Sequence, residues 1–193
     1  MKEKDLKIYK EMQKLHGFLI DEIKKKWNRV LPFGEEFTDR WEKSEYLDFG
    51  KGTSIYDSSL VFGDVKVGEN TWIGPFTILD GTGRLKIGSY CSISTGVQIY
   101  THDTVKWAVS GGKVKYEYAS VKIGDCCYIG PSVIISKGVT IGRHCVIGAN
   151  SFVNKSIPNY SIVFGSPCKI VGKVIIDRNG KPSFKYKKYA SKN

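Results

Sequence analysis

The amino-acid sequence predicts a coiled parallel β-solenoid, and three observations support this. An aliphatic residue stands at every sixth position from residue 123 to residue 153, and glycine directly follows four of these six anchors. The same register continues upstream from residue 55 to residue 99, with one eight-residue step. Two positions before each later anchor stands a small or β-branched residue, which faces the same side of a strand as the anchor: Cys127, Val133, Val139, Cys145 and Ser151. A period of six matches neither the 3.6 of a helix nor the 2 of a single strand, and it is typical of short stacked strands separated by turns.

Composition agrees with one domain that has a continuous core. The chain has 193 residues, of which 41% are hydrophobic and 25% charged. No apolar run approaches the roughly 18 residues of a membrane span, and the first ten residues lack the apolar core of a signal peptide. We therefore expect a cytoplasmic protein. The five cysteines agree, because Cys91, Cys127 and Cys145 occupy inward positions where free thiols behave as small hydrophobic groups.

The net charge of +11 raises the question of an anionic partner. Lysines concentrate at residues 2–26 and 181–192, and no nucleic-acid-binding motif accompanies them. We expect most of them to lie on solvated surface, a minority to serve a phosphate-bearing ligand, and no nucleic acid to be bound.

Residues 1–52 are predicted to be helical. Over residues 5–30 apolar residues recur at spacings of three and four, and a shorter helical stretch follows over residues 36–47, after Pro32 and Gly34. We favour a cap that covers the open end of the solenoid, where strand edges are otherwise unpaired. The alternative is an oligomer contact or a lid.

The solenoid domain is predicted over residues 53–173. Three six-residue units make one coil of 18 residues, so fourteen anchors correspond to about five coils. The period fails over residues 79–86, and again over residues 103–120, where a projecting loop is predicted with Gly111 and Gly112 at its tip. A loop of this length is unusual unless it has a function.

Residues 174–193 are predicted to form a hairpin and a basic tail. Asn179 and Gly180 are the favoured pair for a two-residue turn, and residues 187–193 are expected to be frayed.

The repeats of residues 55–153, with the segment IPNYSIVFGSPCKIVGK that follows, resemble the hexapeptide-repeat acyltransferases. The Thr-His pair at residues 101–102, the loop after it and the G-x-P-C-K sequence resemble the galactoside and maltose acetyltransferase group. The resemblance covers about residues 53–173. It implies a mainly β, left-handed parallel β-helix and a homotrimer with active sites between subunits. It also implies transfer of acetyl from acetyl-CoA to a sugar hydroxyl or amino group, such as that of a nucleotide-linked amino sugar or a surface-polysaccharide sugar.

His102 is the candidate general base. It stands where the coil gives way to the long loop, and an imidazole ordinarily titrates near neutral pH. The resemblance implies that this histidine deprotonates the acceptor as it attacks the thioester. The alternative is a surface histidine bonded to Asp103 or to a turn carbonyl. His16 and His144 are expected to be structural.

Further site residues are implied by the resemblance. Pro131 stands where some family members have a serine that stabilises the thioester oxyanion, which leaves Gly130 and Ser136 as candidate donors. The remaining candidates for acetyl-CoA would meet the pantetheine arm or the phosphates: Ala149, Asn154, Lys155, Lys169 and Lys173.

For the acceptor, Asp80 aligns with an acidic residue that contacts sugar hydroxyls in the galactoside type, although the acidic neighbour found there is Gly81 here. Tyr100, Asp103 and Trp107 flank the base and are candidates for stacking on or hydrogen-bonding a sugar. Trp107 would equally suit a contact with a neighbouring subunit.

Three other functions are weighed against sugar acetylation. A zinc-dependent γ-carbonic anhydrase shares the fold but needs three histidine ligands, and the three histidines here are widely spaced, so no metal is expected. A non-catalytic solenoid scaffold would have no reason to interrupt its coils at a histidine. Acetylation of a xenobiotic or an antibiotic stays open within the transferase class.

Overall fold

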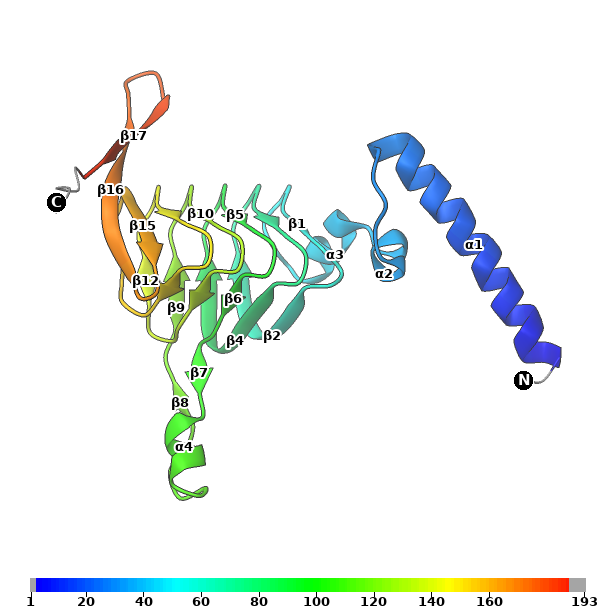
Figure 1. The fold of residues 1–193 in the computed structure, drawn as a ribbon, viewed down its shortest axis with the longest axis horizontal. Helices are drawn as coiled ribbons and strands as arrows, with labels where there is room; N and C mark the ends of the chain where they lie inside the picture. The colour runs from blue at the N-terminus through cyan, green and yellow to red at the C-terminus, as the bar shows by residue number, and fades with distance from the viewer. Residues whose placement is uncertain (1–2, 188–193) are drawn as a thin grey trace, which may run out of the picture.

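The structure is a computed structural model that describes residues 3–187. Stacked coils form a column, with helices beyond the first coil, a hairpin at the last coil and one loop that projects from the side (Figure 1). The last six residues of the predicted basic tail lie outside the described residues. No described helix is both long and apolar enough to cross a membrane.

The coils have three flat faces made of parallel strands. The first face holds β1 (Ser54–Ile55), β3 (Trp72–Ile73), β5 (Ser92–Ile93), β10 (Tyr128–Ile129), β13 (Val146–Ile147) and β15 (Ser161–Gly165). The second face holds the first halves of β2 (Leu60–Val67) and β4 (Ile78–Ile87), then β6 (Gln98–Ile99), β11 (Ile134–Ile135) and β14 (Phe152–Val153). The third face holds the second halves of β2 and β4, then β9 (Val121–Ile123) and β12 (Thr140–Ile141).

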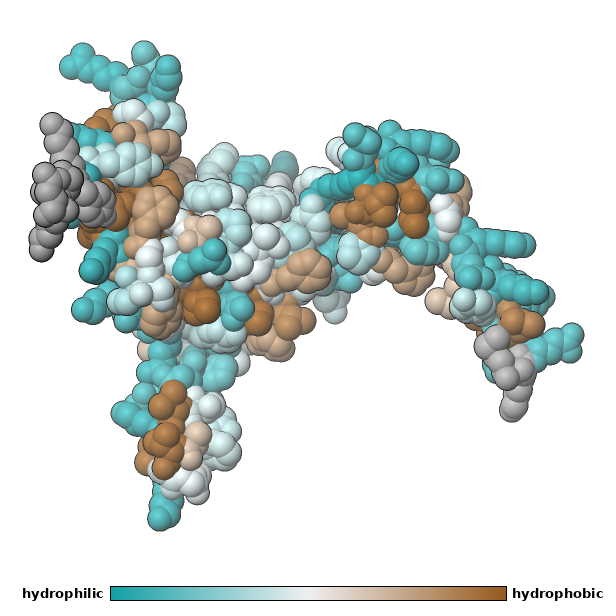
Figure 2. Space-filling model, in the orientation of Figure 1, coloured by the Kyte–Doolittle hydropathy of each residue, from teal (hydrophilic) through white to brown (hydrophobic). Residues whose placement is uncertain are grey.

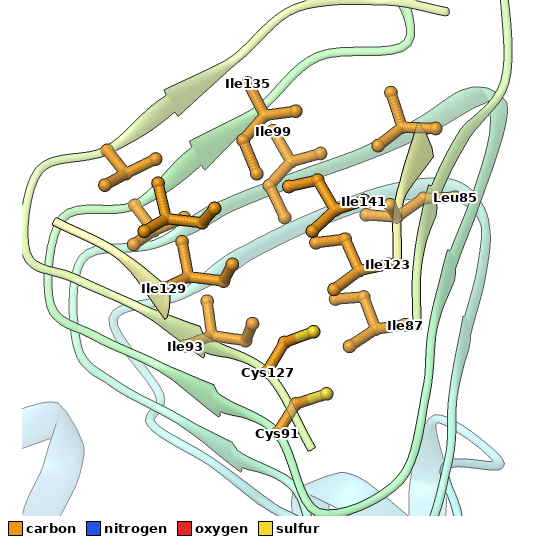
Figure 3. Packing of buried hydrophobic residues seen from close by; sticks show 14 of the residues in the cluster. Leu85, Ile87, Cys91, Ile93, Ile99, Ile123, Cys127, Ile129, Ile135 and Ile141 are labelled. Atoms are coloured by element: carbon orange, nitrogen blue, oxygen red, sulfur yellow. The ribbon is translucent and has the colours of Figure 1, made fainter. Parts of the chain in front are cut away.

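The six-residue pattern is confirmed as the core of this column. Thirteen of the fourteen anchors are buried, and Val61 is half-buried. Figure 3 shows anchors from all three faces pointing into one interior, with Cys91 and Cys127 at a corner. The thiols of Cys91 and Cys127 donate to the carbonyl oxygens of Gly124 and Gly142 in the next coil.

The coil count is slightly higher than predicted. Five coils are complete, and β15 begins a sixth by pairing with β13. Ile157, which bridges to Ile141, follows Val153 after only four residues, and Val163, which pairs with Ile147, is the next core residue. Ile162 instead packs in a second cluster with residues of the carboxyl-terminal hairpin. The six-residue rule therefore fails after Val153, although the solenoid continues.

The amino-terminal helices divide the capping role unequally. α3 (Arg40–Tyr46) packs on β1, and Leu47 and Phe49 join the core, so this part covers the open end. α1 (Glu3–Trp27) has no buried residue and contacts α2 (Phe33–Phe37), so the expectation of a cap is wrong for α1. α3 already occupies the coil end, and α1 extends away from it (Figure 1).

The projecting loop has more structure than was predicted. Its stem is an antiparallel pair of β7 (His102–Asp103) and β8 (Glu117–Tyr118), and the short helix α4 (Val105–Val109) lies between them. Gly111 and Gly112 form the tip in left-handed conformations, with φ of 64° and 83°.

The predicted carboxyl-terminal hairpin is formed by β16 (Cys168–Ile176) and β17 (Pro182–Tyr186), and β16 adds to the first face beside β15. The predicted two-residue turn is wrong. The amide N–H of Asp177 donates to the carbonyl of Lys181, so three residues make the turn, and of these Gly180 has a positive φ of 79°.

Candidate active site

His102 stands at the first residue of the loop stem, directly after Thr101, a buried residue of the third coil. The strand register pairs Ile78 with Gln98 and Leu79 with Ile99. The residues of β4 that follow Leu79 therefore lie one coil below the residues that lead into the loop stem. Asp80 comes immediately after this pair and is 2% exposed. The coil geometry therefore brings a buried carboxylate beneath the histidine.

The Asp80 carboxylate is fully engaged inside the chain. Its Oδ1 accepts hydrogen bonds from the amide and the hydroxyl of Thr82, at 2.9 and 2.6 Å. Its Oδ2 accepts from the Thr101 amide at 2.8 Å and lies 2.7 Å from Nδ1 of His102. Burial by itself raises the pKa of Asp80, but these hydrogen bonds outweigh it and hold the pKa well below its ordinary value. Asp80 is therefore an anion.

This network sets the tautomer of His102. The Thr82 hydroxyl gives its one proton to Asp80, so it can only accept at the 3.0 Å contact with Nδ1 of His102. Nδ1 therefore carries the proton and donates it to Asp80. In the neutral ring, Nε2 then has a free lone pair, and it has no hydrogen-bond partner within residues 3–187. This is the arrangement of a general base held by a carboxylate.

A hollow of about 390 Å³ adjoins His102. His102, Tyr100, Ile134, Ser136 and Phe152 line it, together with the first residues of the loop. The second face supplies the apolar side chains, because Ile134 and Phe152 pair in register and point outward. The hollow is thus partly apolar, with a few polar groups beside the histidine, as is usual for ligand sites.

Lys137 anchors the loop stem to the solenoid. Its ammonium lies 3.1 Å from Asp103 Oδ2 and 3.0 Å from Glu117 Oε2, which are register partners on β7 and β8. Hydrogen bonds from Lys137 and from the Val105 amide lower the pKa of Asp103, and the pKa of Lys137 is raised by Glu117 and Asp103. The stem that begins with His102 is therefore fixed by charges from the next coil. On the other strand, the ring of Tyr118 stacks on His102 at 5.9 Å.

The structure brings together some of the predicted acetyl-CoA residues. Ser136 lines the hollow, and Asn154 follows one coil above, because β11 and β14 pair in register. Lys155 is the next residue and is exposed. Ser136 and Asn154 thus continue the line of Tyr100 up the second face. The Ser136 hydroxyl donates to the Val153 carbonyl at 3.2 Å.

The other predicted acetyl-CoA residues do not line this hollow. The Gly130 amide donates to the Ile147 carbonyl at 2.9 Å, so it is not available as an oxyanion donor. Ala149 is exposed beside Gly130, at the corner that precedes the second face. Lys169 and Lys173 are exposed on β16, next to the first face.

Among the predicted acceptor residues, Asp80 requires a correction. Its buried oxygens are occupied, so it holds His102 and does not face a sugar. Tyr100 and Asp103 do line the hollow, with the Tyr100 hydroxyl bonded to Gln98 and Asp103 paired with Lys137. Trp107 packs edge-on against Tyr116 in the loop and does not line this hollow.

Sequence reasoning missed the residues that position His102 and the loop stem, which are Thr82, Thr101, Glu117, Tyr118 and Lys137. The sequence does contain an indication of Thr82. The coil before His102 is 20 residues long, and counting back 20 residues from His102 leads to Thr82, close to Asp80. The three histidines lie on separate elements, and no group of three potential metal ligands converges within the part of the chain that is described.

Comparison with known proteins places the chain in a family. Residues 120–155 match the model of the bacterial transferase hexapeptide (six repeats). A maltose O-acetyltransferase from Clostridium difficile 630, known from its crystal structure, is 30% identical, with 82% of this chain and 85% of that chain covered and a TM-score of 0.55. This protein belongs to the hexapeptide-repeat transferases.

Two further proteins are similar over shorter lengths. The galactoside O-acetyltransferase of Escherichia coli K12 is 31% identical over 128 residues, which cover 56% of this chain and 63% of that relative, so the chain spans less than two thirds of its length. AntD, an N-acyltransferase from Bacillus cereus solved with dTDP and 3-hydroxybutyryl-CoA, shares the fold at 24% identity and a TM-score of 0.58, with 64% of this chain and 70% of that chain covered.

Proposed function

We propose that this protein is an acetyl-CoA-dependent acetyltransferase that acts on a hydroxyl or amino group of a sugar, with His102 as the general base. This proposal rests on the hydrogen bond between Asp80 and His102. The bond keeps the proton of the neutral ring on Nδ1 and leaves Nε2 free, and His102 lines a hollow. Support also comes from the maltose and galactoside O-acetyltransferases to which the chain is similar.

The hollow fits the acyl donor. Ile134 and Phe152 give it an apolar wall for a pantetheine arm, and Ser136 adds a hydroxyl. Asn154 and Lys155, one coil above, are suited to the polar end of the cofactor. Bound acetyl-CoA would supply the acetyl group as an activated thioester.

The protein's own part is proton transfer and orientation. Nε2 of His102 takes the proton from the acceptor hydroxyl or amine, which strengthens that group as a nucleophile. The ring becomes an imidazolium, and the anionic Asp80 on Nδ1 stabilises its charge. Tyr118, stacked on the ring, and Thr82, bonded to Nδ1, hold the imidazole in one orientation.

Release of CoA tests this proposal. Wild type, His102→Ala and the control His144→Ala are assayed with a thiol reagent against plain glycosides, free amino sugars and nucleotide-linked amino sugars. Turnover of one acceptor, with about a hundredfold loss or more in His102→Ala only, supports the proposal. Mild alkaline hydrolysis of the product then distinguishes an ester from an amide. Failure of wild type to bind CoA would instead favour a scaffold.

We also propose a homotrimer with active sites between subunits. The loop projects from the solenoid, and its Val105, Val109 and Trp107 are exposed. Figure 2 shows hydrophobic surface on this loop and on the amino-terminal helices. Light scattering should give three times the subunit mass of 21.6 kDa, and a monomer at micromolar concentration would refute the trimer.

A further inference from the structure

Three lysines form a ladder on the third face. Lys66 pairs in register with Lys86, and Lys86 with Lys122, so the three side chains lie on consecutive coils. Neighbouring strands are about 4.8 Å apart. All three lysines are exposed, and none forms an ion pair or a side-chain hydrogen bond within residues 3–187.

The ladder is a local feature of the first three coils. The register partner of Lys122 in the fourth coil is Thr140, which is uncharged. Like charges directly opposite each other destabilise a sheet. Three unpaired lysines in adjacent positions therefore cost stability in the free protein, and a bound anion would relieve that cost.

The ladder lines a hollow of about 620 Å³, which is within the size range of ligand sites. Arg84 also lines it, held in a turn with a positive φ of 76°. Against these four cationic side chains stands one carboxylate, Asp64. Arginine and lysine are the residues that bind phosphate groups, the first through paired hydrogen bonds and the second as a point charge.

This basic hollow adjoins the candidate active site. Tyr118 lines the hollow, and its ring stacks on that of His102. Gly83 lines it as well, and its amide donates to the Thr101 hydroxyl at 2.7 Å. His102 lines one hollow and Tyr118 the other, so a substrate bound in the basic hollow lies one aromatic ring away from the base.

We propose that Lys66, Lys86, Lys122 and Arg84 bind the diphosphate of a substrate. This rests on the proposed function. Two sources share the chemistry, a nucleoside diphosphate attached to the acceptor sugar and the phosphates of CoA. Lys169 and Lys173, expected to serve CoA, lie beside the first face, which makes the ladder a separate cationic group.

Calorimetric titration tests the site with pyrophosphate, UDP and adenosine 3′,5′-bisphosphate, a fragment of CoA. The ladder variant is Lys66→Gln/Lys86→Gln/Lys122→Gln. The control Lys10→Gln/Lys14→Gln/Lys24→Gln makes the same change of charge on α1. We expect the ladder variant to bind pyrophosphate at least about tenfold more weakly, and the control to bind it like wild type.

The two nucleotides identify the source. Weaker binding of UDP in the ladder variant assigns the site to the acceptor, and weaker binding of the bisphosphate assigns it to CoA. The proposal is overturned if wild type binds none of the three probes, or if the ladder variant and the control bind them equally. These titrations do not depend on turnover. If the ladder binds pyrophosphate but the protein never releases CoA, the proposed function is refuted and the phosphate site is not.

Discussion

Oδ2 of Asp80 lies 2.7 Å from Nδ1 of His102, across the boundary between two successive coils. The carboxylate comes from the solenoid wall, and the imidazole comes from the first residue of the projecting stem. A residue of the regular solenoid therefore orients His102, the first residue of the irregular loop.

Replacing Asp80 by Asn tests this relationship through catalysis. An amide lacks the charge that stabilises an imidazolium, and its NH₂ group cannot accept from Nδ1. We expect kcat to fall on the order of a hundredfold, with little change in the KM for the acceptor. Thr82→Val, which removes the weaker contact with Nδ1, is expected to lower kcat less. Equal activity of Asp80→Asn and wild type would contradict the assigned role.

Asp80 should also contribute to stability in a pH-dependent way. Its pKa is lowered in the folded state, so the contribution is present above its ordinary value of 3.8 and is lost as the pH falls toward the folded-state value. The difference in free energy of unfolding between wild type and Asp80→Asn should therefore narrow from about pH 5 to about pH 2. Urea unfolding across this range measures it, and a difference that widens toward acid would exclude the explanation.

Lys137 should control the order of the loop stem. Lys137→Met removes the ammonium group that Asp103 and Glu117 share. The two carboxylates then lie near each other without that cation between them. We expect faster amide hydrogen exchange over residues 102–118, with unchanged exchange in the solenoid strands. Lys113→Met, an exposed change in the same loop, serves as the control. Unaltered exchange in the Lys137 variant would show that the stem is held by other contacts.

Two adjacent isoleucines of β11 offer a test of the repeat. Ile135 is fully buried, whereas Ile134 is 38% exposed. Ile135→Ala should cost about 2–5 kcal/mol of unfolding free energy because it leaves a cavity, and Ile134→Ala about 1 kcal/mol or less. Chemical unfolding of both variants gives the comparison. Similar losses would mean that the inward and outward positions are misassigned.

The fold was predictable because one rule recurs along the chain. Each anchor repeats the same evidence, so a single position that is only half-buried, such as Val61, does not change the conclusion. The same rule predicted the strand register, but not where the rule ends, because Ile157 follows Val153 after only four residues.

The site was predictable only in part. His102 was chosen as the candidate base because it stands at a break in the period, but its hydrogen-bond partners depend on contacts between coils. Asp80 is 22 residues away and was assigned to a sugar, and Lys137 reaches the stem from the next coil. The loop has no period, so neither α4 nor its ion pairs had a signal in the sequence. α1 has a clear apolar stripe, but the stripe does not specify what the helix packs against.

The most direct test of the account compares His102→Gln with His144→Gln on the best acceptor, with CoA affinity measured for both. His144 stacks on Tyr160 at a turn and is a matched control outside the site. We predict that kcat/KM falls on the order of a hundredfold or more in His102→Gln alone, with the Kd for CoA within about twofold of wild type. A His102→Gln enzyme that binds CoA normally and turns over within a few-fold of wild type would contradict the assignment of His102 as the base.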